Sequence, residues 1–436
     1  MKGQALYKRA LRVIPGGNQL FSKRPELFLP ELWPTYYAKA KGAEIIDLDG
    51  KRYIDMSIFG VGACCLGYAD RDVDSSVKRA IDKGSASTLN CPEEVELAEL
   101  LCQLHPWASM VRFSKSGGEA VSIAIRIARA YTGKDKIAFC GYHGWCDWYL
   151  AANLGSKKAL DGHLMPGLPV AGVPRALKDT MFPFNYGKLN ELEAIVKKHG
   201  KGLAAIIMEP ARDEPDRAFL KRVRAISLSL KTVLIFDEIT CGFRMNTGGI
   251  HLLLGVHPDI AVFAKSMGNG YPIAAIIGTR KVMQAAQSTF ISSTNWTERV
   301  GFTAALATIK KFREKNVGRH LVRAGKKIQN GWRQAAGETG LKIKISGIPP
   351  ISHFSFDYDN SLVISTFFTQ EMLKKGFLAW TQFKSSYAHK DEHINKYLKA
   401  VGEVFCEIKK LLDEGDIQAH LEGPVAKRGF YRFVRN

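Results

Sequence analysis

The stretch DIAVFAKSMGNGYPIAAIIG, residues 259–278, places a single lysine, Lys265, between two short apolar runs. Such runs are typical of strands buried on both faces of a parallel sheet. Lys265 directly follows the first run, at the carboxyl end of the strand that this run predicts. Taken alone, it is either an exposed charge that closes a strand or a buried amine with a chemical role. Gly268 and Gly270 weaken the first interpretation, because they let the loop pass close to a flat ligand.

Three more apolar runs lie upstream and alternate with segments of helical periodicity. This alternation predicts βαβ units and an α/β fold with a mainly parallel central sheet flanked by helices. The five predicted strands are residues 136–140, 203–208, 232–237, 260–264 and 273–278. Residues 43–56 instead predict a hairpin, since apolar residues stand on both sides of an Asp49-Gly50 turn.

After about residue 300 the pattern changes to longer amphipathic helices, which predicts a second, smaller α+β domain. The elements predicted there are helices over residues 301–336 and 391–413 and strands within 341–347 and 353–358. We expect residues 57–305 to form the large domain and residues 306–436 the small one. Residues 1–56 are expected to be an N-terminal segment that joins the small domain.

The composition is that of an ordinary folded protein, with 46% hydrophobic and 24% charged residues in a chain of 436. The formal net charge of +20 suits nucleic acid, a membrane surface or an anionic small molecule. Because the basic residues are spread along the chain, the nucleic-acid hypothesis rests on net charge alone. No apolar run approaches the roughly 18 residues that span a bilayer, and the cysteines lack metal-site spacing. We expect a cytoplasmic protein with no nucleic-acid partner, no membrane partner and no metal.

Two segments besides Lys265 carry candidate functional residues. Ser116, Gly117 and Gly118 stand directly before a predicted helix, where backbone amides and the helix dipole attract an anion such as phosphate. An ordinary capped helix start gives the same pattern and is the simpler interpretation of this motif alone. Asp237 ends a predicted strand, and ligands of α/β proteins bind at the carboxyl ends of parallel strands. Because Lys265 follows about one strand-helix-strand repeat later, we expect both side chains to face one cleft.

A fourth segment, GYHGWCDWY (141–149), places aromatic rings in the loop after the first predicted strand. Aromatic residues there more often pack in a core than stack on a ligand. The segment MGNGYP (267–272) contains Gly-x-Gly, but Pro272 and a strand follow it rather than a helix. A dinucleotide-binding turn is therefore excluded at this position.

In order and combination these motifs resemble the class III (subgroup II) aminotransferases of the fold type I pyridoxal-phosphate (PLP) enzymes. Within that family the chain is most similar to the glutamate-1-semialdehyde aminomutase branch. The resemblance runs through nearly the whole chain, and its most specific motifs are those of Asp237 and Lys265. The similar segments include IPGG (14–17), IDLDGKRYIDM (46–56), CPEEVELAELL (91–101), RFSKSGGEA (112–120), GYHG (141–144), FDEITCGFR (236–244) and residues 258–278.

The resemblance implies PLP as the cofactor and a homodimer with its active site at the subunit interface. It also implies that Lys265 binds PLP covalently and moves a proton during the reaction, and that Asp237 keeps the pyridine nitrogen protonated. The other residues implied to bind the cofactor are Ser116, Gly117 and Gly118 at the phosphate, Tyr142 and Ile239 on the two ring faces, His143, Glu209 and Thr240, and Ser293 or Thr294 from the facing subunit.

Three departures from the family pattern concern the substrate. Trp145 follows the HG pair where ornithine- and GABA-type relatives carry an Arg, and Ser22 and Lys23 stand where the aminomutase has an Arg. The longer EPxxGxxG signature is absent after Glu209. The sequence of residues 141–149 and 291–298 is most similar to that of the branch associated with sugar and polysaccharide biosynthesis.

The implied reaction is transamination from an amino acid, with L-glutamate the expected donor, to an aldehyde or ketone of a carbohydrate. An oxidised sugar or a sugar acid of the Kdo type is the expected kind of acceptor. Ser22, Lys23 and Trp145 are the candidate substrate-binding residues. The alternative is an intramolecular amino transfer of the glutamate-1-semialdehyde 2,1-aminomutase type.

Overall fold

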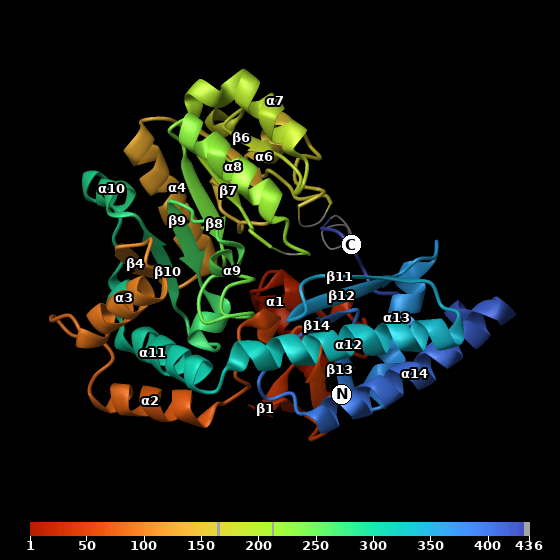
Figure 1. The fold of residues 1–436 in the computed structure, drawn as a ribbon. Helices are drawn as coiled ribbons and strands as arrows, with labels where there is room; N and C mark the ends of the chain where they lie inside the picture. Colours follow the sequence, from red (N-terminus) through yellow and green to blue (C-terminus); the bar gives the residue numbers. More distant parts are fainter. Residues whose placement is uncertain (164–165, 212, 431–436) are drawn as a thin grey trace. The chain divides into compact units, whose positions relative to one another are not determined.

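The computed structural model describes residues 1–163, 166–211 and 213–430 (Figure 1). The chain divides into two compact units. The large unit contains residues 71–318 with Gly429 and Phe430, and the small unit contains residues 1–70 and 319–428. The domain boundaries expected from the sequence, after residues 56 and 305, stay predictions. None of the helices in the described part of the chain is long and apolar enough to cross a membrane.

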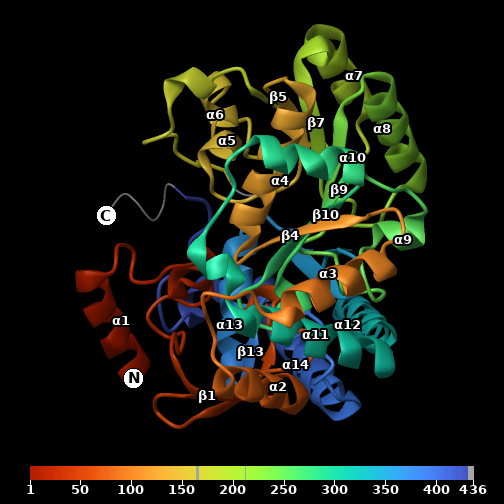
Figure 2. The ribbon, with the colours of Figure 1, turned by 90° about the vertical axis from the view of Figure 1, so that its left-hand side faces the viewer.

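The large unit is built on a seven-stranded sheet in which five neighbouring strands are parallel (Figure 2). In spatial order the strands are β4 (Met110–Ser114), β10 (Ala274–Gly278), β9 (Ile260–Phe263), β8 (Val233–Asp237), β7 (Leu203–Met208), β5 (Lys136–Cys140) and β6 (Met181–Pro183). β10 runs antiparallel to both of its neighbours, β4 and β9. All five predicted strands and the mainly parallel sheet are therefore confirmed.

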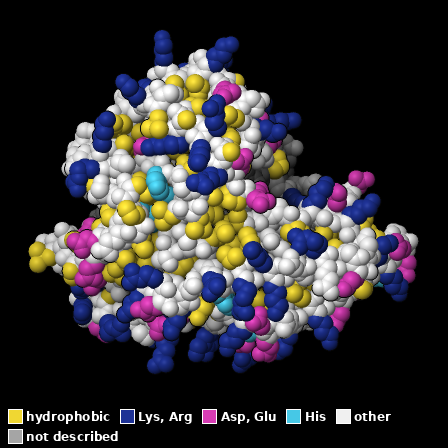
Figure 3. All heavy atoms as spheres, viewed as in Figure 1, with side chains coloured by type: hydrophobic (Ala, Val, Ile, Leu, Met, Phe, Trp, Pro, Cys, Tyr) yellow, Lys and Arg dark blue, Asp and Glu magenta, His cyan; other side chains and the backbone are white. Residues whose placement is uncertain are grey.

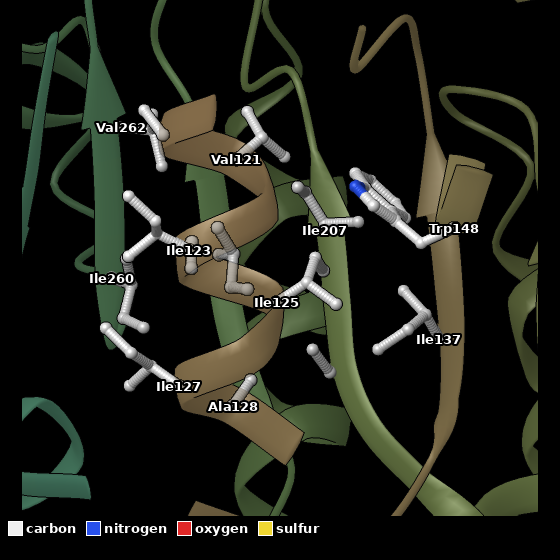
Figure 4. Packing of buried hydrophobic residues seen from close by; sticks show 14 of the residues in the cluster. Val121, Ile123, Ile125, Ile127, Ala128, Ile137, Trp148, Ile207, Ile260 and Val262 are labelled. Carbon is white, nitrogen blue, oxygen red and sulfur yellow. The ribbon is translucent and has the colours of Figure 1, made fainter. Parts of the chain in front are cut away.

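Helices cover both faces of this sheet. Helix α4 (Gly117–Thr132) packs on one face, where its Ile123 and Ile127 lie in one cluster with Ile260 of β9 (Figure 4). Helices α7 (Leu189–His199) and α8 (Arg217–Ser229) pack on the other. Successive residues of β8 alternate between these cores, so that Ile235 faces α4 whereas Phe236 faces α8. Burying each such side chain stabilises the fold by about 1.5–3 kcal/mol, which fixes the strand ends that carry the candidate site.

The remaining helices of the large unit are α2 (Arg71–Asp82), α3 (Pro92–Leu104), α5 (Asp147–Leu150), α6 (Ala152–Gly155), α9 (His251–Leu254), α10 (Arg280–Met283) and α11 (Arg299–Glu314). Helix α11 packs against α2 and α3. Figure 3 shows Lys and Arg side chains distributed over the viewed face, with Asp and Glu among them. This distribution agrees with the spread of basic residues along the sequence.

The small unit contains two smaller sheets and four long helices. One sheet has the order β1 (Tyr37–Lys41), β2 (Glu44–Asp47), β3 (Arg52–Met56), β13 (Phe377–Ala379), and the other β11 (Ile343–Ser346), β12 (Ile351–Phe356), β14 (Gln382–Lys384). The helices are α1 (Lys2–Val13), α12 (Val317–Thr339, which begins in the large unit), α13 (Ser361–Lys374) and α14 (Asp391–Glu414). The predicted hairpin is confirmed, since β2 and β3 pair antiparallel around a turn in which Gly50 has φ +85°.

The single helix predicted over residues 301–336 is wrong. The structure has two helices there, because α11 ends at Glu314 and α12 begins at Val317. Asn316, between them, has φ +47°, a left-handed conformation that asparagine adopts more easily than most residues. Apolar periodicity continues on both sides of this break, so the periodicity alone did not reveal it.

Candidate active site

The carboxylate of Asp237 lies at the carboxyl end of β8 and is only 3% exposed. Its Oδ2 lies 2.8 Å from Nδ1 of His143, and its Oδ1 accepts a hydrogen bond from the backbone N–H of Ile239 at 3.1 Å. A carboxylate has about four lone-pair sites for hydrogen bonds. Among the residues that the structure describes, two donors reach Asp237, so it retains the capacity to accept from a ligand.

The partner of Asp237, His143, is fully buried and fixed at both ring nitrogens. Its Nε2 lies 3.1 Å from the carbonyl oxygen of Cys140 at the end of β5. The carbonyl oxygen of Cys140 lies at one ring nitrogen and the Asp237 carboxylate at the other. These two contacts fix the orientation of the imidazole and hold it against Asp237.

Lys265 begins a short 3-10 helix (Lys265–Gly268) directly after β9. β9 is the parallel neighbour of β8, with Val262 opposite Asp237, so the lysine and the aspartate stand at the same edge of the sheet. The Lys265 ammonium donates to Oγ1 of Thr240 at 2.9 Å. Its backbone has φ +46°, a conformation that costs a non-glycine residue about 1 kcal/mol or more and that is concentrated at functional sites.

The start of α4 supplies open backbone donors beside these strand ends. A Cβ added to Gly117 would lie 2.8 Å from Cδ1 of Ile239, so only glycine lets the loop after β8 come this close to the helix. The N–H groups of the first turn have no partner inside a helix. Those of Gly117 and Gly118 thus point out of the helix start, where the dipole also favours an anion.

Ser116 and Glu119 form a capping box at the start of α4. The Glu119 carboxylate accepts from the backbone N–H and the hydroxyl of Ser116, at 2.8 and 3.1 Å. Sequence reasoning missed Glu119, although the spacing of Ser116 and Glu119 is the usual signal for this motif. The capping interpretation and the phosphate interpretation are therefore compatible, because Ser116 caps the helix while the glycine amides stay available.

The aromatic loop after β5 is held by Glu209. The buried Glu209 carboxylate accepts from the backbone N–H of Tyr142 at 3.2 Å. Gly141 has φ +105°, and a Cβ there would lie 2.6 Å from Oε2 of Glu209, so this position requires glycine. The Tyr142 ring packs edge-on against Tyr149. Glu209 thus positions the tyrosine through its backbone.

Five more residues were predicted to bind the cofactor or the substrate. Ser293 and Thr294 are exposed at the start of the 3-10 helix Thr294–Thr297. Trp145 is 72% exposed and borders Gly118. Ser22 and Lys23 lie in the small unit, in the 3-10 helix Phe21–Lys23. The cofactor and substrate roles of these residues stay predictions.

A second buried carboxylate-histidine pair follows directly in the chain, and sequence reasoning missed its histidine. Glu238 lies 2.7 Å from Nδ1 of His251 and also accepts from the backbone N–H groups of Ile250 and His251 and from the Cys241 thiol. Burial is the largest single influence and raises the pKa of Glu238, but the hydrogen bonds from His251 and Cys241 and the electrostatic attraction of His251 together outweigh it, so the pKa lies below its usual value. Trp107 donates to Nε2 of His251 at 2.9 Å, which closes this network.

Comparison with known proteins agrees with the geometry. The family model of the class-III aminotransferases matches residues 31–379. The chain belongs to the class III aminotransferases. This aminotransferase is 31% identical over 425 residues to a 3-aminobutyryl-CoA aminotransferase of Cloacimonas acidaminovorans, which covers 94% of this chain and 98% of the relative. It is also 32% identical over 434 residues to a glutamate-1-semialdehyde 2,1-aminomutase of Syntrophobacter fumaroxidans, again covering 94% and 98%.

A similar solved structure contains the cofactor PLP. The FumI protein of Sphingopyxis sp. MTA144, solved with PLP, has a TM-score of 0.85 and 26% identity, and the match covers 94% of this chain and 97% of that one. The aminotransferase has the α/β fold of the type I PLP enzymes and is a PLP-dependent transferase. The donor set at the sheet edge fits this cofactor, since it combines a lysine amine, a buried carboxylate and open helix-start amides.

Proposed function

We propose that this PLP-dependent aminotransferase transfers an amino group from L-glutamate to an aldehyde or ketone of a carbohydrate, with Lys265 and Asp237 as its catalytic residues. The observation that carries the catalytic assignment is their position on neighbouring parallel strands, β9 and β8, at the same edge of the sheet. PLP, when bound, supplies an electron-withdrawing ring that stabilises negative charge on the carbon next to the transferred nitrogen.

Each catalytic residue has a specific task at a specific atom. The Lys265 Nζ holds the cofactor and then moves a proton to and from the carbon that carries the amino group. Thr240 fixes this amine through the 2.9 Å hydrogen bond to its Oγ1. The Asp237 carboxylate would keep the ring nitrogen of the cofactor protonated, and His143 fixes that carboxylate through the 2.8 Å contact between its Nδ1 and Oδ2.

The remaining residues bind and orient the cofactor. The amides of Gly117 and Gly118 would receive the phosphate, and the ring of Tyr142 and the side chain of Ile239 would contact the two faces of the cofactor ring. Two observations support this assignment. Ile239 lies close to Gly117 at the start of α4, and the Glu209 carboxylate accepts a hydrogen bond from the backbone N–H of Tyr142.

The carbohydrate acceptor is supported by the side chains at the positions where relatives bind a carboxylate. Trp145 stands in place of an arginine after His143-Gly144, and Ser22 and Lys23 stand in place of another. The Ser22 hydroxyl and the Lys23 ammonium group can form hydrogen bonds with an amino-group acceptor that is rich in hydroxyl groups. Ser22 and Lys23 are our candidate substrate contacts.

We further propose that the enzyme is a homodimer that acts in the cytoplasm. Ser293 and Thr294 are exposed on the chain that carries them, which leaves their hydroxyls available to the phosphate of a facing subunit. Sedimentation should give a mass twice that of the chain. A Ser293→Ala, Thr294→Ala double variant should lose PLP affinity without losing the dimer, and an active monomer would contradict the proposal.

The reaction is tested on purified protein with L-glutamate and a panel of sugar aldehydes and keto sugars, by following 2-oxoglutarate. The expected result is 2-oxoglutarate formation that depends on both substrates and is absent in Lys265→Ala. If glutamate-1-semialdehyde outperforms every carbohydrate, the acceptor assignment is wrong.

The aminomutase alternative is favoured by the 32% identical relative of that name. An intramolecular transfer needs no external amino donor. Conversion of glutamate-1-semialdehyde in the absence of L-glutamate would therefore support the aminomutase, whereas an absolute requirement for a donor supports the transaminase.

A further inference from the structure

Two glycines bring the aromatic loop into contact with the first turn of α4. A Cβ on Gly144, which has φ +105°, would lie 3.3 Å from Cα of Gly118. A Cβ on Gly118 would in turn lie 3.3 Å from Nε1 of Trp145. Gly118 is therefore the position at which the indole of Trp145 approaches the helix backbone, with its N–H edge next to the start of α4.

The residues that follow Trp145 in the loop are hydrogen-bonded to the same helix. The Cys146 thiol donates to the carbonyl of Gly118 at 3.6 Å, and Trp148 Nε1 donates to the hydroxyl of Ser122, one turn further on, at 3.0 Å. These contacts hold the residues after Trp145 against α4, and the close approach of Gly144 to Gly118 places the residue before it there as well. The backbone that carries the indole is thus set by packing and hydrogen bonds.

Some hydrogen-bond donors at the start of α4 already have an acceptor among the described residues, and others do not. The N–H and hydroxyl of Ser116 both donate to Glu119, and a glycine at 118 supplies no side-chain donor. The indole N–H only donates, and no acceptor for Trp145 Nε1 occurs among the residues described. Trp145 as a whole is 72% exposed, and its Nε1 lies beside the first turn of α4, whose amides have no partner inside the helix.

We propose that Trp145 is a phosphate-binding residue, whose indole N–H donates to the phosphate of PLP beside the amides of Gly117 and Gly118. The proposal rests on the proposed cofactor site and changes the role of Trp145 from a substrate contact to a cofactor contact. It adds one side-chain donor to the backbone amides at the start of α4.

The test compares two ligands that differ only in the phosphate. Cofactor-free wild-type protein and Trp145→Phe are titrated with PLP and with pyridoxal, and binding is followed by absorption. Phenylalanine keeps an aromatic ring but has no N–H. We expect Trp145→Phe to weaken PLP binding by roughly 10- to 100-fold, the effect of losing one hydrogen bond to a charged group. Pyridoxal binding should change less than about twofold, because pyridoxal offers no phosphate acceptor.

Trp296→Phe is the matched control, because its indole N–H already donates to Glu119 Oε1 at 3.4 Å near the same helix start. Its PLP affinity should stay within about threefold of wild type. Unchanged PLP binding in Trp145→Phe would overturn the inference, and so would an equal loss for PLP and pyridoxal. Wild-type protein that fails to bind PLP would instead overturn the proposed cofactor site itself.

Discussion

Asp237 and Glu238 are adjacent carboxylates, each paired with a buried histidine, yet their surroundings differ. The Glu238 carboxylate accepts four hydrogen bonds from the described residues, and Trp107 occupies the far nitrogen of its histidine. The Asp237 carboxylate accepts two, and its neighbours on the sheet edge include Lys265. A filled network stabilises a fold, whereas a carboxylate with remaining acceptor capacity can serve a ligand.

The largest effect is expected at Asp237, the carboxylate that retains the capacity to accept hydrogen bonds from a ligand. Asp237→Asn keeps the shape of the side chain but removes the negative charge that holds a proton on the cofactor ring. We expect kcat/KM to fall by about 10³-fold, roughly 4 kcal/mol of transition-state stabilisation. Steady-state kinetics check this result, with thermal unfolding as the control for folding. Near-wild-type turnover would remove the distinction between the two carboxylates.

Substitution of Glu238, whose carboxylate already accepts four hydrogen bonds from the described residues, should lower stability rather than activity. Glu238→Gln places an amide NH₂ against groups that themselves donate, so at least one buried donor loses its acceptor. We expect the free energy of unfolding to fall by about 3 kcal/mol, while kcat changes less than about threefold. Urea unfolding and kinetics on the same preparation measure both. A variant that is fully stable but inactive would reverse our assignment.

The network around Glu238 also predicts how stability depends on pH. His105 donates from Nδ1 to the carbonyl of Leu101 and accepts from the N–H of Gly249 at 3.0 Å. Burial lowers the pKa of His105 to about 4. Because the unfolded histidine titrates near 6.5, the unfolded state binds more protons between these values, and stability falls as the pH drops through this window.

His105 should contribute about 2 kcal/mol to the loss of stability between pH 7 and pH 5. His105→Gln keeps one donor and one acceptor without titrating, so its loss over the same interval should be smaller by that amount. Urea unfolding at both pH values makes the comparison. Equal losses in the two proteins would show that His105 does not titrate as its burial requires.

The smallest effect is expected at Thr240, which orients Lys265 without taking part in chemistry. Thr240→Val removes the hydroxyl that accepts from Nζ and should lower kcat by about 5-fold, near 1 kcal/mol. Thr240→Ser keeps the hydroxyl and should stay close to wild type. If serine and valine are equally impaired, the methyl group matters rather than the hydrogen bond.

Five of the seven strands of the large unit were predictable because they are continuous apolar runs, whereas β4, which contains Arg112, and the three-residue β6 were missed. Those runs end at Asp237 and near Lys265, and parallel pairing of β8 and β9 then places both residues at one edge. The hairpin at Asp49-Gly50 was predictable from its turn residues. These features depend on short stretches of chain, which a sequence displays directly.

Features that depend on long-range packing, or on a single backbone angle, were not predictable. The contact between His143 and Asp237 joins residues 94 positions apart, and nothing in either segment specifies it. The break at Asn316 depends on one backbone angle, and the approach of Trp145 to Gly118 depends on how the aromatic loop folds back onto α4. His251 belongs to the same class, because its link to Glu238 appears only once the chain is folded.

The most direct test of the contrast between the two carboxylates is the visible absorption of the PLP-loaded protein as a function of pH. Wild type, Asp237→Asn and Glu238→Gln are compared at equal cofactor occupancy. Our account predicts that Asp237→Asn shifts the cofactor absorption or its pH titration, whereas Glu238→Gln gives the wild-type spectrum. A spectrum that changes in Glu238→Gln and stays unchanged in Asp237→Asn would contradict it.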